Sequence, residues 1–326
     1  MKIGIDVMGG DYAPQSCIEG IILAYKEISS DIQLCLFGNK ETITSLLLKH
    51  GANPEKFEII HAPEVIEMGE HPTKAFTQKP NSSIFKGFEY LKQQKIDAFA
   101  SAGNTGAMLV GSIYNVGVIS GVIRPCTTAV LPKENGDLGL ILDVGTNPDC
   151  KPDLLFQFGI LGSLYAKYVF NIDNPKVALL NIGEEEEKGS ITCQSAYKLM
   201  KDTKNFNFIG NIEGRDIFKD KADVVVCDGH TGNVVLKLSE AIFRMFAKKG
   251  FTGDFLNRYN YENYGGTPIL GINASVVIGH GISNSVAIKN MILLTRDVHE
   301  AKLYEKISAS MFKHTQEQET ECIQKK

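Results

Sequence analysis

Segments typical of β-strands alternate with segments typical of α-helices along almost the whole chain. The apolar, β-branched runs expected to be strands are 2–7, 32–37, 57–60, 96–100, 127–131, 138–143, 177–181, 206–209, 223–227 and 275–278. The segments with apolar residues at helical spacing, expected to be helices, are 15–28, 41–50, 83–94, 106–116, 152–170, 191–203, 234–249 and 285–311. This alternation is typical of an α/β fold around a mostly parallel sheet.

The polar turns after these strands are the expected place for a ligand site, because parallel sheets bind ligands at the carboxyl ends of their strands. The turns that combine Gly with Asp, Asn, Thr or Ser are Asp6–Asp11, Ser101–Gly106, Asp143–Asn147, Asn181–Gly189 and Asp228–Asn233. One such turn is ordinary loop composition. Together they predict one polar rim that binds an anion or a substrate of phosphate size. Neither G-x-G-x-x-G nor G-x-x-x-x-G-K-[ST] occurs, which argues against dinucleotide and P-loop sites.

The stretch Ala222–Lys237 is the most informative of these turns. A β-branched run ends in a glycine-bearing turn, and the turn opens into an amphipathic helix. The unpaired N–H groups and the dipole at a helix start favour anions. Gly229 and Gly232 let the backbone approach a ligand, while Thr231 and Asn233 add a hydroxyl and an amide. An ordinary capped loop fits the same pattern, and both alternatives stay open from the turn alone.

Lys188 stands just before Gly189 and a predicted helix start. A cation there can pair with an anion held at helix N-termini, although spacing alone favours an ordinary surface lysine. The preceding carboxylates, Glu184–Glu187, are expected to form a solvated face. His280–Ser283 follows the last predicted strand, so His280 is either part of a sixth rim turn or a buried, hydrogen-bonded histidine.

The helix predicted over 234–249 carries apolar residues on one side and basic residues on the other. The apolar positions, expected to face the core, are Val234, Val235, Leu238, Ala241, Ile242, Met245 and Phe246. The basic side, with Lys237, Arg244 and Lys248, is expected to be solvated; the alternative is a surface for an acidic partner or anionic lipid. We expect a single α/β domain over 1–326, with a short helical hairpin near 234–262 and a frayed tail after about 314.

Bulk properties exclude several classes of protein. The formal charge of -4 argues against nucleic-acid binding. The seven scattered cysteines include no C-x-x-C, which indicates a reducing compartment and argues against a zinc site. No apolar run is long enough to span a bilayer, and the strand-like start at Lys2–Asp6 leads us to expect no signal peptide. The sequence therefore predicts a cytoplasmic protein without a bound metal.

Taken in order, the motifs of this chain closely resemble those of the bacterial phosphate acyltransferase family (PlsX). The resemblance is carried by Asp6–Pro14, Ser101–Ala107, Leu142–Asn147, Phe208–Asp216, Asp228–Asn233, Asn263–Gly266 and His280–Ser283. It implies a homodimer and a three-layer α/β/α sandwich related to phosphotransacetylases and to isocitrate/isopropylmalate dehydrogenases. It also implies that long-chain acyl carrier protein and phosphate give acyl phosphate and free carrier protein. The acyl phosphate then feeds acylation of glycerol 3-phosphate in phospholipid synthesis, and no cofactor takes part.

The resemblance also implies site residues. Lys188 and Asn233 match the catalytic lysine and asparagine of the family. The positions expected to bind substrate or phosphate are Asp6, Gly9, Gly10, Ser101, Gly103, Asn104, Thr105, Gly106, Asp143, Asn147, Asp228, Gly229, Thr231, Gly232 and His280. His230 and His280 are fallback acid/base candidates.

The implied partners are an acidic carrier protein, a glycerol 3-phosphate acyltransferase and, as a peripheral contact, the membrane. The candidate contact residues are Lys237, Arg244, Lys248, Lys249 and Arg258. The sequence departs from the family pattern at Thr146, where alanine is expected, and between Lys237 and Asn263, where only 25 residues stand in place of a longer hairpin. That short hairpin leaves attachment to the membrane open.

We expect direct attack of phosphate on the thioester, because the sequence offers no convincing Ser-His-Asp or Cys-His arrangement. Lys188 would pair with the phosphate or stabilise the departing thiolate, and Asn233 would stabilise the oxyanion. The alternatives are a short-chain phosphate acetyl- or butyryltransferase that uses coenzyme A, and a non-catalytic regulator that binds a phosphometabolite. A dehydrogenase on the same fold is a weaker alternative.

Overall fold

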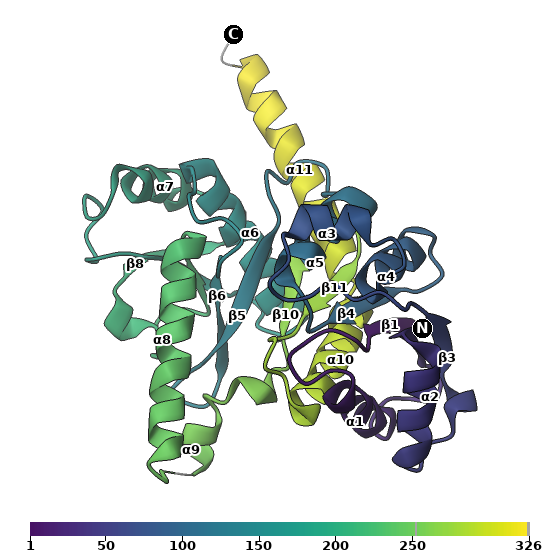
Figure 1. The fold of residues 1–326 in the computed structure, drawn as a ribbon. Helices are drawn as coiled ribbons and strands as arrows, with labels where there is room; N and C mark the ends of the chain where they lie inside the picture. Colours follow the sequence, from purple (N-terminus) through teal and green to yellow (C-terminus); the bar gives the residue numbers. More distant parts are fainter. Residues whose placement is uncertain (252, 325–326) are drawn as a thin grey trace. The chain divides into compact units, whose positions relative to one another are not determined.

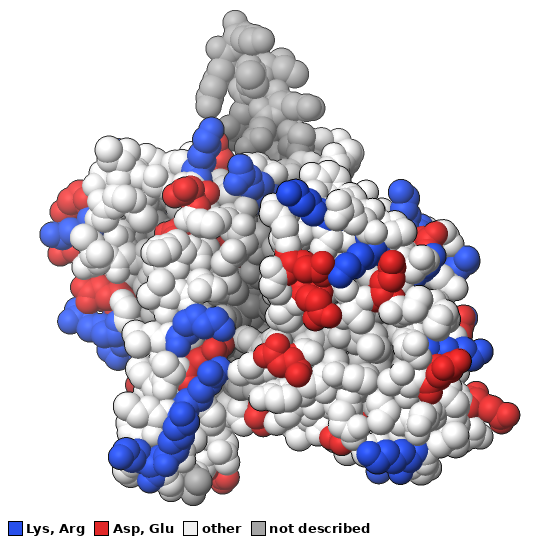
Figure 2. All heavy atoms as spheres, viewed as in Figure 1, with Lys and Arg blue, Asp and Glu red and all other residues white. Residues whose placement is uncertain are grey.

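The chain folds into two compact units, each built from two separate segments (Figure 1). Unit 1 comprises Met1–Val118 and Tyr261–Glu300, and unit 2 comprises Ile119–Asn260 and Ala301–Lys326. The computed structural model describes residues 1–251 and 253–324, and of residues 261, 315 and 317–324 the backbone only. The single domain predicted over 1–326 stays a prediction. Acidic and basic side chains are interspersed over the face drawn in Figure 2.

Unit 1 contains a sheet with the strand order β3-β2-β1-β4-β11-β10. Its strands are β1 Lys2–Asp6, β2 Gln33–Gly38, β3 Glu58–His61, β4 Ala98–Ser101, β10 Thr267–Leu270 and β11 Ser275–Ile278. Neighbouring strands are parallel except β10, which is antiparallel to β11. Its α-helices are α1 Gln15–Tyr25, α2 Lys40–Lys49, α3 Pro72–Gln78, α4 Ser83–Lys92, α5 Thr105–Gly111 and α10 Ser285–Glu300. Shorter turns of helix are η1 Pro54–Lys56, η2 Ser112–Val116 and η4 Tyr261–Asn263.

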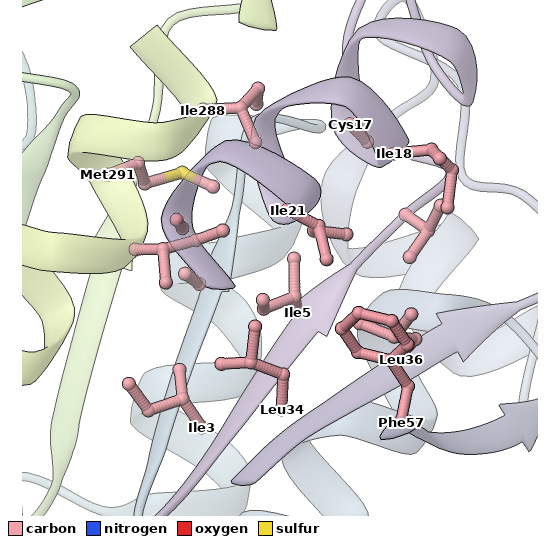
Figure 3. Close-up of a cluster of buried hydrophobic side chains, with 14 of the residues drawn as sticks. Ile3, Ile5, Cys17, Ile18, Ile21, Leu34, Leu36, Phe57, Ile288 and Met291 are labelled. Carbon is pink, nitrogen blue, oxygen red and sulfur yellow. The ribbon is translucent and has the colours of Figure 1, made fainter. Parts of the chain in front are cut away.

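Helices cover both faces of the unit 1 sheet, because its strands are apolar on both sides. On one face α1, α2 and α10 pack on β1 and β2. Ten of the side chains in this cluster are labelled in Figure 3: Ile3, Ile5, Cys17, Ile18, Ile21, Leu34, Leu36, Phe57, Ile288 and Met291. On the other face α3, α4 and α5 pack around Phe37 and Phe99, whose rings meet edge to face at 5.9 Å. Unit 1 therefore has three layers.

Unit 2 contains a sheet with the strand order β5-β6-β9-β7-β8. Its strands are β5 Cys126–Pro132, β6 Leu138–Leu142, β7 Lys176–Leu180, β8 Asn207–Ile212 and β9 Val224–Val226. β5 is antiparallel to β6, and the others run parallel. Its helices are α6 Pro152–Tyr168, α7 Ile191–Lys201, η3 Gly214–Asp216, α8 Gly229–Lys248, α9 Asp254–Asn257 and α11 Leu303–Gln324.

The β6 and β9 side chains alternate between two helical layers in unit 2. Gly162 of α6 approaches Val224 and Leu142 so closely that a Cβ there would lie 2.5 Å from the Val224 side chain. On the opposite face Ile141 and Val225 belong to a cluster that the start of α8 covers. The predicted α/β fold, with a mostly parallel sheet between helical layers, is confirmed. Several helices start within one residue of the expected position because a side chain caps them; these caps are Asn39, Ser82, Asn104 and Ser190. α8 starts at Gly229, before the expected residue 234, because Asp228 caps it and the residues predicted as a turn form its first turn.

Most of the apolar stripe predicted to face the core on α8 is exposed instead, and of its members Val235 packs on the core. Its members Val234, Leu238, Ile242, Met245 and Phe246 are 40–59% exposed. The side of α8 that meets the core carries Val235 and Leu236. This helix has apolar residues on two sides, and periodicity alone cannot say which side meets the core.

Other differences concern ends and breaks of helices. The segment 285–311, predicted as one helix, divides into α10 and α11, because Lys302 takes the left-handed backbone conformation at φ +51°. α11 extends to Gln324, and the frayed tail expected after about residue 314 stays a prediction. Its Glu and Gln residues are good helix formers. The last two residues lie outside the described part of the chain.

Candidate active site

In unit 1 the turns after β1, β4 and β11 lie side by side, because these neighbouring strands are parallel and end at one edge of the sheet. Asp6 ends β1, and its buried carboxylate accepts hydrogen bonds from the Ser101 hydroxyl at 2.6 Å and the Met8 N–H at 2.9 Å. Ser101 Oγ accepts the Gly103 N–H at 2.9 Å. Burial raises the pKa of Asp6. His280 is half-buried in the turn after β11.

Close contact between these turns depends on glycine. A Cβ at Gly9 would lie 2.6 Å from the Gly103 nitrogen, so a side chain there would push the two turns apart. Gly10 has φ +107°, which side chains disfavour. The next N–H, that of Asp11, donates to the Gly281 carbonyl at 2.7 Å. The turns thus form one connected surface.

The start of α5 is held by contacts within unit 1. Asn104 caps α5, and its Oδ1 accepts the Ala107 N–H at 3.0 Å. Its Nδ2 donates to carbonyls of the loop at 67–70 at 3.0–3.2 Å. Gly106 packs against α3, and Thr105 is exposed at the first position of α5. Asn104 therefore fixes the turn through its own side chain.

In unit 2 the parallel strands β6, β9 and β7 bring their following turns to one edge. Asp143, directly after β6, is fully buried. Its carboxylate accepts hydrogen bonds from Thr127 N and Oγ1, Val144 N, and Asn147 N and Nδ2. The carbonyl of Asn147 accepts the Gly229 N–H at 2.8 Å. Asp143 and Asn147 thereby join the β6 turn to the start of α8.

The start of α8 is tightly capped. The Asp228 carboxylate accepts the Thr231 N–H and the Thr231 hydroxyl, each at 2.8 Å. The Gly232 N–H donates to the Asp228 carbonyl at 3.0 Å, and the Gly229 N–H is already bonded. Among the described residues, no protein acceptor meets the His230 N–H.

Asn233 lies where the β6 turn meets α8. Its Nδ2 is 3.4 Å from the Val144 carbonyl oxygen, and a Cβ at Gly145 would lie 3.0 Å from the same Nδ2. Gly145 has φ +120° and leaves room for this amide. A contact of 3.4 Å is at the long end for a hydrogen bond. The Asn233 amide is therefore oriented by its neighbours and still able to donate to a ligand.

Gly232→Ala is expected to destabilise the protein by about 1–3 kcal/mol, because overpacking costs that much. A Cβ at Gly232 would lie 2.0 Å from the Asp143 carbonyl oxygen. Urea unfolding of both proteins measures the loss. The control is Gly214→Ala, since a Cβ at Gly214 has nothing within 4 Å. Equal unfolding midpoints for the two variants would contradict the close approach.

The turn after β7 carries Lys188, whose side chain is exposed. No acceptor meets its ammonium among the residues that the structure describes. The carboxylates before it lie at the surface, as predicted for Glu184–Glu187. Two of them form surface ion pairs, Glu184 with Lys221 and Glu186 with Lys201, each at 2.7 Å. Since β7 and β9 are neighbours and parallel, the turns with Lys188 and Asn233 follow adjacent strands. The unit 2 edge thus carries an exposed cation and a helix start after adjacent strands.

Comparison with known proteins decides the family. The model of a family described as "Fatty acid synthesis protein" matches residues 1–306. Phosphate acyltransferase of Dictyoglomus turgidum is 41% identical over 335 residues, which covers 97% of this chain and 99% of that protein. Phosphate acyltransferase of Pelotomaculum thermopropionicum is 42% identical over 331 residues, with 95% of each chain covered.

The chain belongs to the phosphate acyltransferase family. The family is one of acyltransferase enzymes, as the resemblance implied. Among solved structures, a phosphotransacetylase from Streptococcus pyogenes is similar with a TM-score of 0.65 at 17% identity, covering 92% of this chain and 94% of that one. A 4-hydroxythreonine-4-phosphate dehydrogenase from Klebsiella pneumoniae has a TM-score of 0.53 at 14% identity, covering 91% and 98%. These likenesses concern the fold alone.

Three cysteines of unit 2, Cys126, Cys150 and Cys227, are poor nucleophiles. Burial raises the pKa of the Cys150 thiol to about 12, and it raises the pKa of Cys126 and Cys227 well above the usual value. Cys227 and Cys150 contact the Asp143 and Asn147 carbonyls at 3.6 and 3.4 Å. The thiolate is the reactive form of cysteine, so these thiols pack as apolar groups beside the turn.

The basic residues predicted to contact a partner differ in their surroundings. Lys237 and Arg244 both pair with Glu240, at 3.1 and 3.5 Å, and Glu240 is only 8% exposed. Lys248 and Lys249 are exposed at the end of α8, and Arg258 packs against the Gly136 turn. Figure 2 shows Lys and Arg side chains gathered over this part of unit 2.

Sequence reasoning missed three amide side chains that hold the Lys188 turn: Asn181, Gln194 and Asn211. Asn211 lies in the motif Phe208–Asp216, but no pattern of residues connects it with Lys188. Among the described residues, no group of three or more His, Cys, Asp and Glu side chains is placed to hold a metal. Nor does any described helix combine the length and apolarity needed to cross a bilayer.

Proposed function

We propose that the protein transfers a long-chain acyl group from the thioester of acyl carrier protein to inorganic phosphate. The products are free carrier protein and an acyl phosphate, which would serve the acylation of glycerol 3-phosphate in phospholipid synthesis. One observation carries the proposal: the exposed Lys188 ammonium and the Asn233 amide follow adjacent parallel strands. Membership of the family supports the reaction.

In this reaction a phosphate oxygen attacks the carbonyl carbon of the thioester and forms a C–O bond. The carbonyl oxygen becomes an oxyanion, and its electron pair returns as the C–S bond breaks. The sulfur leaves as a thiolate and takes up a proton, which gives the free thiol of the carrier. No group is oxidised or reduced, so the step requires no redox cofactor. The raised pKa values of Cys126, Cys150 and Cys227 favour direct attack over a thiol-linked acyl-enzyme.

Lys188 and Asn233 have separate roles in the proposal. The Lys188 ammonium pairs with the phosphate and holds it for attack, since a lysine is a compact, mobile point charge suited to phosphate. The Asn233 amide donates to the developing oxyanion, where one such donor contributes about 3 kcal/mol. The free His230 N–H at the start of α8 is a further donor for the phosphate. In a second version, Lys188 stabilises the departing thiolate.

The other predicted binding residues take supporting roles. Asp6 and Asp143 have their carboxylates turned inward onto protein donors, so they shape the turns without touching substrate. Gly9, Gly10, Thr105 and His280, at the turns of unit 1, stay predicted substrate-binding positions.

The proposed function is tested by release of free thiol from palmitoyl acyl carrier protein, with and without phosphate. We expect release only with phosphate, together with an acyl phosphate that hydroxylamine traps. Phosphate-dependent release from palmitoyl coenzyme A alone would shift the donor to coenzyme A. Phosphate binding without release from either donor would favour a non-catalytic regulator.

We further propose that the acidic carrier protein docks on the exposed lysines at the end of α8. Lys248→Glu with Lys249→Glu is expected to weaken carrier-protein binding by about tenfold at low salt, because rim charges act mainly through long-range attraction. Titration calorimetry at two salt concentrations measures this. Lys204→Glu, on an exposed loop of the same unit, is the control. If the Lys204→Glu control lost as much affinity for the carrier protein as the double variant, the docking surface would lie elsewhere.

We propose that a second copy of this chain packs against the exposed apolar stripe of α8 and buries it in a dimer interface. Its members are spaced along one side of a long helix, which suits antiparallel packing of two such helices. We place the homodimer in the cytoplasm, and peripheral contact of the stripe with a membrane is the alternative.

A further inference from the structure

Three successive carbonyls around Lys188 each accept a hydrogen bond from a side-chain amide. Gln194, in the first turns of α7, donates through Nε2 to the Glu187 carbonyl at 2.8 Å and to the Gly189 carbonyl at 3.2 Å. Asn181, directly after β7, donates through Nδ2 to the Lys188 carbonyl at 3.1 Å. The peptide groups on both sides of Lys188 are therefore fixed in orientation.

The shape of the turn depends on the contact between Asn181 and Gly189. Gly189 has φ +84°, and a Cβ there would lie 2.1 Å from Asn181 Oδ1. That Oδ1 accepts the Ile182 N–H at 2.9 Å, so both ends of the amide are used. Asn181 thus fills the space that a side chain at residue 189 would need, and it brings the first and last residues of the turn into contact.

A third amide anchors the turn from β8. Asn211 is only 6% exposed, and its Nδ2 donates to the Glu185 carbonyl at 2.9 Å. The same carbonyl accepts the Lys188 N–H at 3.2 Å. The ion pairs of Glu184 and Glu186 lie at the surface, where such pairs contribute little. The amides therefore do most to hold the turn.

The contrast between the Lys188 backbone and its ammonium points to a role. The N–H and the carbonyl of Lys188 both form hydrogen bonds within the protein. The ammonium, by contrast, is exposed and meets no acceptor in the described part of the chain. We propose that Gln194 and Asn181 are positioning residues that aim Lys188 at the phosphate. This proposal rests on the proposed function of Lys188.

The expected size of the effect follows from geometry. A misplacement of about 1 Å can slow an oriented reaction by about 100-fold. A lysine has a long, flexible stem, so a fixed Cα removes only part of its freedom. We therefore expect loss of the Gln194 amide to have a smaller effect than loss of the ammonium itself.

Gln194→Ala is expected to lower kcat/KM for phosphate by about tenfold, with a higher KM for phosphate and an unchanged KM for the acyl donor. Alanine is the best helix former, so α7 should persist. Gln194→Met keeps the length of the side chain without the donor and should behave in the same way. Lys198→Ala, exposed on the same helix, is the control and should behave as wild type.

A double variant separates positioning from general damage. If Gln194 acts through Lys188, adding Gln194→Ala to Lys188→Ala should cause no further loss of rate. Trypsin cleavage after Lys188 gives a readout that needs no activity. We expect it to be about fivefold faster in Gln194→Ala, because each lost hydrogen bond makes local opening easier.

The possible results are distinguishable from failure of the proposed function. Wild-type protein without phosphate-dependent release would overturn the function. The rate of trypsin cleavage would still show whether Gln194 holds the Lys188 turn. A different outcome would overturn the positioning role alone. In that outcome the wild type is active and Lys188→Ala is impaired, while Gln194→Ala and Gln194→Met are as active as the wild type. A further loss in the double variant would also overturn it.

Discussion

Lys188→Ala is expected to slow phosphate-dependent release of carrier-protein thiol by about 100-fold, a typical loss when one charged donor leaves a reacting centre. The ammonium has no protein partner within the described residues, so its removal breaks no internal ion pair. The bound phosphate then lacks its positive partner. Initial rates at saturating acyl donor and varied phosphate measure the effect.

Two further variants control this result. Lys198→Ala removes an exposed lysine of the same unit and should leave the rate unchanged. Lys188→Arg keeps the charge but alters its shape, and it should recover only part of the rate. A folded Lys188→Ala protein with near-wild-type turnover would remove Lys188 from the chemistry.

Asn233→Ala is expected to lower kcat by about 100-fold, or about 3 kcal/mol of transition-state stabilisation, with little change in KM for phosphate. The oxyanion that the amide serves exists only during the reaction, so ground-state binding should not suffer. The amide makes one long contact, 3.4 Å to the Val144 carbonyl, so its removal should cost the folded protein little stability. Single-turnover kinetics with palmitoyl carrier protein measure the chemical step.

Asn233→Asp tests the same donor with almost no change in shape, because the carboxylate accepts where the amide donates. It should be at least as slow as Asn233→Ala. Ser239→Ala, also on α8, removes a hydroxyl that donates to the Val235 carbonyl, and it should keep its rate. If Asn233→Ala raised the phosphate KM and left kcat alone, the amide would bind phosphate instead of the oxyanion.

Strand and helix periodicity predicted most of the fold, because the strands are apolar on both sides and the helices are long. β10 was missed, since Thr267–Leu270 is short and contains Pro268, a residue that argues against a strand. α3 was missed because it spans only Pro72–Gln78. The break at Lys302 depends on one backbone angle that no side-chain pattern reveals.

The candidate site was predictable at the level of turns and not of contacts. Parallel strands necessarily bring their ends to one edge, which is why the turns after β6, β9 and β7 lie together. The sequence could not predict that the Asp143 carboxylate accepts hydrogen bonds from the protein itself, because one donor, Thr127, belongs to another strand. Gln194 holds the Lys188 turn from the next helix, and nothing in its helical position distinguishes it from a surface residue.

The division of unit 1 into two chain segments has a consequence for synthesis. Ile288 and Met291 on α10 complete the cluster around Ile3 and α1, yet they leave the ribosome long after residue 118. At roughly 5–20 residues per second, the wait to residue 300 lasts about 10–35 s. During that time the nascent chain exposes an apolar surface on α1, which favours capture by a chaperone over folding of the first segment alone.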